Sequence, residues 1–310
     1  MSLSRRGFLV AAALVGAGCG AGGPEGAVRV AAGEPGGFYV EFAGLLAAEI
    51  TRAEPGLRAG VVETAGSVQN LQRVSDGHAD LALTLADALD VARSGGKPFR
   101  AALPLRALGR VYENYMQVVV RADSPVRALG DLAGHRISLG AAGSGAALFG
   151  SRLLATAGVA VVADHRPLAE AARALRDGRV EALLWSGGVP TPALADLDAA
   201  VGIRLLDLGG QVAGLRAAHG AVYDQVVVPE GTYRSTADTM TVGVANLLVP
   251  SPTLPDDVVR AVVRVLATRA DRLVPQQAVG TQYLDVRALI DTGSAPLHPA
   301  AAETYRDLHG

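Results

Sequence analysis

The sequence predicts an α/β protein made of two lobes with a cleft between them. Strand-like runs alternate with helical segments, which is the pattern of βαβ units and a largely parallel sheet. This alternation starts afresh near Val118, and 310 residues fit two domains at roughly 100–200 residues each. Half of the residues are hydrophobic and 19% are charged, enough apolar material for two packed cores, which excludes a disordered chain.

The first lobe begins with a strand that runs into a glycine-rich loop and then a long helix. Asp76 and Gly77 mark the end of the next helix, because glycine is the usual residue just after a helix. The elements expected here are strands at 28–32, 57–63 and 79–85 and helices at 38–53 and 67–75.

The second lobe repeats this order. Residues 67–81 and 169–182 both read as a helix, an Asp-Gly stop and a strand entered through an acidic residue. The elements expected are strands at 118–121, 137–140, 180–185 and 241–249, and helices at 146–157, 168–175, 258–266 and around 300–305. The chain therefore divides into a first lobe at 28–117, a second lobe at 118–250, and a return to the first lobe at 251–310. Ligands of open α/β sheets bind at the carboxyl ends of the strands, so the cleft between the lobes is the expected site.

The N-terminal segment has the pattern of an export signal. Arg5 and Arg6 precede an apolar run at 8–15, which is far shorter than the roughly 20 residues that span a bilayer. We expect a twin-arginine-like signal peptide at 1–18, cleavage before Cys19, and a linker at 19–27. Cys19 is the only cysteine and is the expected lipid attachment point, which would place the protein outside the cytoplasm, anchored to the membrane by lipid alone. The alternative is an ordinary signal peptide cut near Cys19, with the thiol a bystander.

Charge and motifs exclude several functions. The net charge of −2 and the absence of a basic block argue against nucleic-acid binding. Ser94 and Lys97 spell S-x-x-K, but they lie in a predicted loop and no K-T-G accompanies them. The chain shows no G-x-S-x-G around its candidate serines, no nucleotide-binding glycine motif in its glycine loops and no metal-ligand spacing of its histidines. We therefore expect no catalysis, no cofactor and no metal.

Three small-residue loops each open a predicted helix. Helix N-termini present unpaired N–H groups and the positive end of the helix dipole, so they can hold an anion without an arginine. The alternative is that these loops are ordinary strand-to-helix turns with serine as the N-cap. The loops are Gly36-Gly37-Phe38-Tyr39, Thr64-Ala65-Gly66-Ser67 and Ala142-Gly143-Ser144-Gly145.

Taken in order, six short strings resemble the TAXI-type extracytoplasmic solute receptors of TRAP transporters, over roughly residues 28–305. The closing Pro296-Leu297-His298-Pro299-Ala300 also fits this family. The strings are Gly36 to Tyr39, Thr64-Ala65-Gly66-Ser67-Val68-Gln69-Asn70-Leu71, Asp76 to Leu81, Val119 to Ser124, Gly140 to Gly145, and Gly188-Val189-Pro190-Thr191-Pro192.

The resemblance implies a two-lobed periplasmic-binding-protein fold of type II, with the ligand cleft between the lobes. Such a receptor captures a small carboxylate solute (an amino acid, a dicarboxylate or a less polar organic acid) and delivers it to a sodium-coupled TRAP permease. Relatives are associated with glutamate, related amino acids and 2-oxo dicarboxylates. The residues expected to bind the ligand are Gly37, Phe38, Tyr39, Thr64, Gly66, Ser67, Asn70, Asp87, Tyr112, Ser144, Gly145, Ser186, Gly188 and Pro190. Trp185 is equally compatible with an apolar wall of the cleft or with core packing.

Three positions depart from the family pattern. Asp87 follows Leu85-Ala86 where Q-S-D is common, Ala146 stands where threonine is common, and Tyr112 is followed by Glu113-Asn114 in place of Pro-Glu. Because polar groups of a site that lose their partners weaken binding, we expect a solute with a carboxylate but a less polar remainder than glutamate. Two other functions stay open: an exported two-lobe α/β enzyme, with Asp87 and Glu113 as its acid pair, and a receptor that reports to a membrane sensor.

Overall fold

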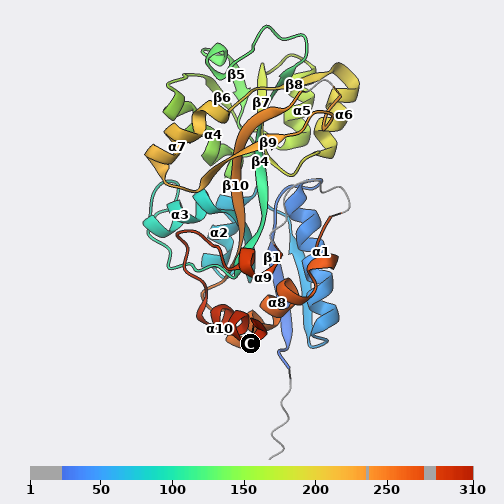
Figure 1. Ribbon diagram of the computed structural model, residues 1–310, viewed down its shortest axis with the longest axis vertical. Coiled ribbons are helices and arrows are strands. Elements are labelled where there is room, and N and C mark those ends of the chain that lie inside the picture. The colour runs from blue at the N-terminus through green and yellow to red at the C-terminus, as the bar shows by residue number, and fades with distance from the viewer. Residues whose placement is uncertain (1–22, 235–236, 276–283, 310) are drawn as a thin grey trace, which may run out of the picture.

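Two long strands, β4 (Gly109–Arg121) and β10 (Thr239–Pro250), run antiparallel to each other through both halves of the molecule (Figure 1). They are the centre of a ten-stranded sheet with the order β2-β1-β3-β10-β4-β7-β5-β6; β8 pairs with β4 and β9 with β10. This computed structural model describes residues 23–234, 237–275 and 284–309. The expected signal peptide and Cys19 lie outside the described residues.

The bounds of the elements are as follows. The remaining strands are β1 (Gly26–Ala31), β2 (Leu57–Val62), β3 (Leu81–Leu85), β5 (Arg136–Ser138), β6 (Val162–Asp164), β7 (Ala182–Gly187), β8 (Ile203–Leu205) and β9 (Tyr223–Val228). The α-helices are α1 (Phe38–Ala53), α2 (Ser67–Ser75), α3 (Ala86–Ser94), α4 (Gly145–Ala157), α5 (Leu168–Arg176), α6 (Pro192–Val201), α7 (Val212–His219), α8 (Asp256–Thr268), α9 (Val286–Leu289) and α10 (Pro299–His309). Short 3₁₀ turns lie at Leu129–Leu132, Gly209–Gln211 and Ala270–Arg272.

The two halves are built on the same plan. In the first, β2, β1 and β3 are parallel and β10 closes the group antiparallel; in the second, β6, β5 and β7 are parallel and β4 closes it. Gly77 and Gly178 both take the left-handed conformation after α2 and α5, with φ of 73° and 69°. Asp80 and Glu181 then donate their backbone N–H to equivalent strands, β1 and β5. The internal repeat expected from the sequence is confirmed, and it makes α1 equivalent to α4 and α2 to α5.

Most predicted elements lie where the periodicity places them, and the helices at 38–53 and 67–75 have the predicted bounds. The crossing strand β4 is longer than the predicted 118–121, because its buried polar residues Glu113, Asn114 and Gln117 break the apolar pattern. Helix α3 was not predicted at all, since it follows β3 directly, and Ser94 is its last residue instead of a loop residue. The elements between residues 190 and 240 were also missed.

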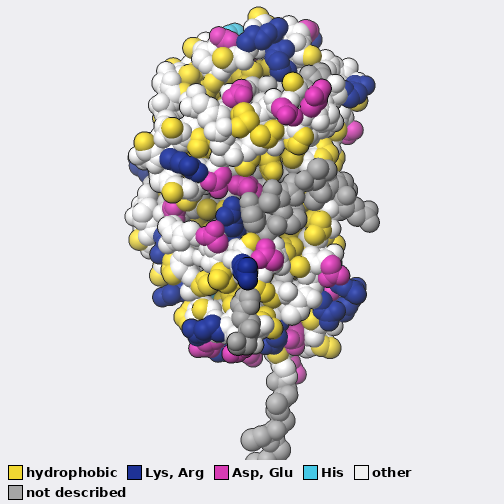
Figure 2. Space-filling model, viewed as in Figure 1, with side chains coloured by type: hydrophobic (Ala, Val, Ile, Leu, Met, Phe, Trp, Pro, Cys, Tyr) yellow, Lys and Arg dark blue, Asp and Glu magenta, His cyan; other side chains and the backbone are white. Residues whose placement is uncertain are grey.

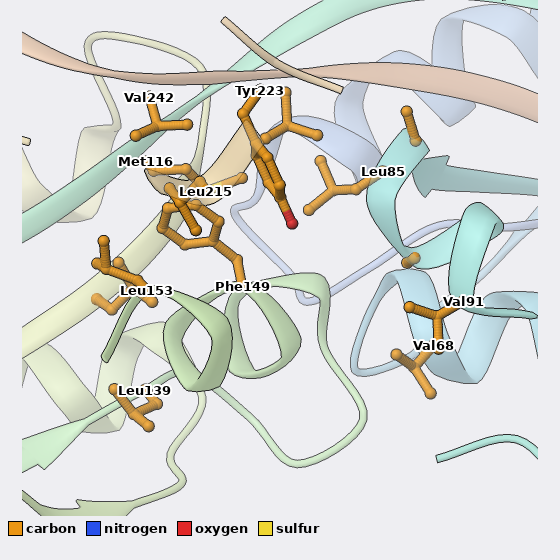
Figure 3. Packing of buried hydrophobic residues seen from close by; sticks show 14 of the residues in the cluster. Val68, Leu85, Val91, Met116, Leu139, Phe149, Leu153, Leu215, Tyr223 and Val242 are labelled. Carbon is orange, nitrogen blue, oxygen red and sulfur yellow. The ribbon is translucent and has the colours of Figure 1, made fainter. Parts of the chain in front are cut away.

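Three hydrophobic clusters form the core. One packs α1, α8 and α10 on the first half, and another packs α5 and α6 on the second. The third contains residues of both halves, and Figure 3 shows Val68, Leu85 and Val91 on one side of it, with Phe149, Leu153 and Leu215 on the other and Tyr223 between them. The two halves therefore share a continuous core on the side of α3, α4 and α7.

The surface in Figure 2 carries acidic and basic side chains intermixed, with no basic stripe on this face. Within the described ranges, none of the helices combines the length and the hydropathy that crossing a bilayer requires.

Candidate functional site

A cavity lies between the two halves, where the N-terminal ends of α1, α2 and α4 meet the end of β7; its empty space, including the open solvent at its mouth, is about 470 Å³. All of its lining residues come from loops at the carboxyl ends of strands, from the first turns of these helices, or from the strands themselves. They are Gly33, Glu34, Gly37, Phe38, Tyr39, Ala65, Gly66, Ser67, Leu85, Asn114, Gly140, Ala141, Ser144, Gly145, Ala146, Trp185, Ser186 and Gly187.

The three helix ends supply N–H groups to this cavity. The first turn of a helix leaves its N–H groups without partners in the helix, and the dipole makes this end positive. At α4 the Ser144 hydroxyl accepts from the backbone N–H of Ala147 at 3.0 Å, so this serine is an N-cap and also lines the cavity. At α2 the residue before the helix is Gly66, whose φ of 121° disfavours any other residue. None of the described lining residues is a lysine or an arginine, so among them only the backbone offers partial positive charge to an anion.

A chain of buried hydroxyl groups supports the α1 and α2 ends. The Tyr39 hydroxyl donates to the side-chain carbonyl of Asn246 on β10 and lies 3.2 Å from the Ser67 hydroxyl. Ser67 also accepts from the backbone N–H of Leu85 at 3.1 Å. Burial raises the pKa of Tyr39 well above its ordinary value, so its hydroxyl stays protonated. Tyr39 and Ser67 are therefore fixed in position beside the cavity.

The other walls combine apolar surface with one amide. Phe38, Leu85 and Trp185 give the apolar part, and Trp185 donates its indole N–H to the Thr191 hydroxyl at 3.1 Å. Trp185 also belongs to the hydrophobic cluster of the second half, so both of its expected roles, wall and core, are met. On β4, the side chain of Asn114 donates to the Ser186 hydroxyl at 3.0 Å.

Contacts between the halves close the cavity. The backbone N–H of Gln69 in α2 donates to the carbonyl of Gly143 at 3.1 Å, before α4. The Glu34 carboxylate of the first half accepts from the backbone N–H of Leu168 at 2.7 Å, at the start of α5. Burial raises the pKa of Glu34, which is the only charged residue among the described residues of the lining. The end of α5, equivalent to that of α2, is thus occupied by a side chain of the protein and does not face the cavity.

A buried ion pair also joins the halves. Asp87 of α3 is fully buried, accepts from the Tyr223 hydroxyl at 3.0 Å, and lies 3.6 Å from the guanidinium of Arg152 in α4. Burial raises the pKa of Asp87 to about 6, against the opposing effect of Arg152 and Tyr223; Asp90 raises it slightly further. The second member of the expected acid pair, Glu113, instead interacts with Arg110 at 3.8 Å, and neither acid lines the cavity.

The structure brings most of the predicted site residues together. Gly188 and Pro190 line a smaller neighbouring pocket that shares Phe38 and Trp185 with the main cavity. Those in the main cavity are Gly37, Phe38, Tyr39, Gly66, Ser67, Ser144, Gly145 and Ser186.

Four predicted site residues line neither pocket. Asn70 is fully buried and donates to the backbone carbonyls of β1 and β3 neighbours, and Thr64 donates to the Asn70 side chain at 2.5 Å. The Tyr112 ring packs behind Phe38 with ring centroids 4.7 Å apart. Asp87 lies in the ion pair described above. These four residues support the lining and do not form it.

Sequence reasoning missed two polar lining residues. Glu34 lies inside the first glycine loop. An acidic residue beside an expected anion site repels the anion, which was a signal that Glu34 bonds to another part of the protein, here the start of α5. Asn114, with Glu113 and Gln117, is among the buried polar residues of the crossing strand β4, and a buried polar residue in such a strand is a sign of a site.

Comparisons with known proteins agree with this architecture. A protein-family model described as "NMT1-like family" matches residues 30–308. Among solved structures, the periplasmic binding protein BugD is 16% identical, with 92% of this chain and 95% of that chain covered and a TM-score of 0.58. A protein of Bordetella bronchiseptica RB50 is 15% identical over 92% and 98%, with a TM-score of 0.57. A structure described as a periplasmic transporter is 16% identical over 91% and 92%, with a TM-score of 0.53. The likeness establishes the two-lobe α/β fold of periplasmic binding proteins.

Proposed function

The chain belongs to the NMT1-like family, and from this we propose that it is an exported solute-binding protein that captures a small organic anion and performs no chemistry on it. The observation that carries the proposal is the convergence of three helix N-termini on one cavity that is closed between two lobes. We propose the lobe bounds expected from the sequence, 28–117 with 251–310 for one lobe and 118–250 for the other.

We propose a carboxylate as the anion. A carboxylate accepts several N–H hydrogen bonds at once, and such charge-assisted bonds are roughly twice as strong as neutral ones. The first N–H groups of a helix have no acceptor within the helix, and five residues from the first two positions of α1, α2 and α4 line the cavity: Phe38, Tyr39, Ser67, Gly145 and Ala146. A group held in this way needs no arginine, which agrees with the lack of arginine among the described lining residues.

The remainder of the solute is less polar than the side chain of glutamate. Phe38, Leu85 and Trp185 offer apolar surface, and apolar contact contributes about 25 cal/mol per Å² buried. The lining holds no cationic side chain that would pair with a second carboxylate. A branched or aromatic monocarboxylate fits these walls better than a dicarboxylate.

The membrane partner we propose is a TRAP permease, on the resemblance to TAXI-type receptors. Export through a twin-arginine-like signal and acylation of Cys19 would hold the receptor beside that permease. Both features concern residues outside the described ranges, and mass spectrometry of the mature protein from its native membrane tests them: an acyl mass on Cys19 is expected.

Trp185 is the only tryptophan of the chain and lines the cavity, so its fluorescence reports occupancy directly. We expect 4-methylpentanoate or 3-phenylpropanoate to change the emission with saturation, glutamate to bind more weakly, and the neutral amides of the same acids to give no response. Trp185→Phe removes the optical signal, and calorimetry on that variant checks that binding persists. Native mass spectrometry of the protein as purified should show a small acid retained. Equal binding of acids and amides, or no binding by any carboxylate of the panel, would refute the proposal.

A further inference from the structure

One polar group in the cavity has no hydrogen-bond partner among the residues that the structure describes. Asn114 lies on β4 opposite Val244 of β10, one residue before the stretch that also pairs with β7, and it is only 3% exposed although it lines the cavity. Its amide nitrogen donates to the Ser186 hydroxyl at 3.0 Å, whereas its carbonyl oxygen is buried and accepts no hydrogen bond from the described residues.

A buried acceptor without a donor is unfavourable. More than nine in ten buried polar groups in proteins are hydrogen-bonded, because losing the partner costs the full desolvation of the group. Ser186, the polar side chain bonded to Asn114, already accepts from the amide nitrogen. Asn114 lines the cavity, so a solute that fills the cavity is the candidate donor for this oxygen.

This acceptor has the opposite polarity to the helix ends. The N–H groups of α1, α2 and α4 require acceptors on the solute, and Asn114 requires a donor. Glu34, the only carboxylate in the lining, is already engaged by the start of α5. A solute that satisfies both ends of the site carries an anionic group and, separately, an O–H or N–H group.

Resting on the proposed function, we propose that the solute is a hydroxy- or amino-substituted carboxylate and that Asn114 selects it by accepting a hydrogen bond from that substituent. Asn114 is then a specificity-determining residue. A hydroxyl and an ammonium group can both donate this hydrogen bond. Comparing the 2-hydroxy with the 2-amino acids shows which of the two the site prefers.

The test is a set of four acids that differ at one carbon: 4-methylpentanoate, its 2-hydroxy and 2-amino derivatives, and its 2-oxo derivative, which can only accept. The same four substituents on 3-phenylpropanoate form a second set. Trp185 fluorescence and calorimetry give the dissociation constants. In at least one set we expect the hydroxy or the amino acid to bind about tenfold or more tightly than both the unsubstituted and the 2-oxo acid.

Asn114→Leu keeps the approximate volume of the side chain and removes the acceptor. The preference for the hydroxy or amino acid should therefore fall to about twofold or less, even if the overall affinity changes. Ser186→Ala leaves the acceptor in place and should keep the direction of the preference, and the wild-type measurement alone still decides if Asn114→Leu does not fold.

Binding of all four acids within about threefold, or tightest binding of the 2-oxo acid, would overturn the role of Asn114 while leaving the proposed function intact. No binding by either set would overturn both.

Discussion

Replacing Gly145 with alanine should keep the two halves from closing fully on the cavity. Gly145 is the first residue of α4, in the second half, and its backbone is not in the left-handed region. A Cβ there would lie 2.5 Å from Cδ1 of Leu85 and 2.7 Å from Oγ of Ser67, both in the first half. Carbon atoms in contact prefer about 3.5–4.0 Å, so either these two side chains or the start of α4 must move by about 1 Å.

The magnitude follows from the overlap. Overpacking of this kind costs about 1–3 kcal/mol, and the closed form bears this cost because the overlap joins the two halves. If the solute binds the closed form, its dissociation constant rises by about 5- to 150-fold. Fluorescence titration measures this change, and small-angle X-ray scattering of the unliganded variant should show a larger radius of gyration than that of the wild type.

Gly44→Ala is the matched control. Gly44 lies inside α1, and a Cβ there meets nothing within 4 Å. The same added methyl group should raise the free energy of unfolding by about 0.5–1 kcal/mol and leave affinity unchanged. A folded Gly145→Ala protein that binds the solute as tightly as Gly44→Ala does would refute the reasoning.

Three further changes address the supporting residues. The pKa of Asp87 is raised from 3.8 to about 6 in the folded protein, so the folded state binds the extra proton and the free energy of unfolding falls as pH rises from about 4 to about 6. Asp87→Asn should flatten that slope in urea titrations across this range, and an unchanged slope would contradict the assignment. Asn70→Ala removes two buried hydrogen bonds to backbone carbonyls and should lower the free energy of unfolding by about 1–3 kcal/mol. Asn70→Asp should be no more stable, because a carboxylate lacks the N–H donors. A change below about 0.5 kcal/mol in urea denaturation would argue against a structural role of Asn70. Ser144→Ala removes the N-cap of α4 at a cost of about 1 kcal/mol, which Ser144→Thr should largely restore in the same assay; equal stability of the two variants would exclude the cap.

Local patterns gave the elements of the fold that depend on nearby residues. The bounds of α1 and α2 follow from apolar periodicity, and their glycine loops are contiguous, so the helix ends of the site could be found from sequence. The glycines after α2 and α5 marked the internal repeat in the same way.

Features that depend on tertiary packing could not be found in this way. Asp87 was expected in the site because it keeps the acid of the Q-S-D string of the resembled family, but α3 begins one residue earlier and Asp87 lies against Arg152 of α4. Tyr112 looked like a wall of the cleft, and the Phe38 ring lies in front of it. The amide nitrogen of Asn114 is bonded to Ser186, which is 72 positions away in sequence, so this contact could not be found from local patterns.

A binding site between two halves of the same βαβ plan would, by itself, bind an asymmetric solute in either of two orientations. The side chain of Glu34 removes that equivalence, because its carboxylate accepts from the start of α5, whereas Gly66 and Ser67 at the matching start of α2 line the cavity. One side of the chamber then offers two open helix ends and the other side offers one. A solute with a single charged group would therefore bind in one orientation, with the same atoms facing β4 each time.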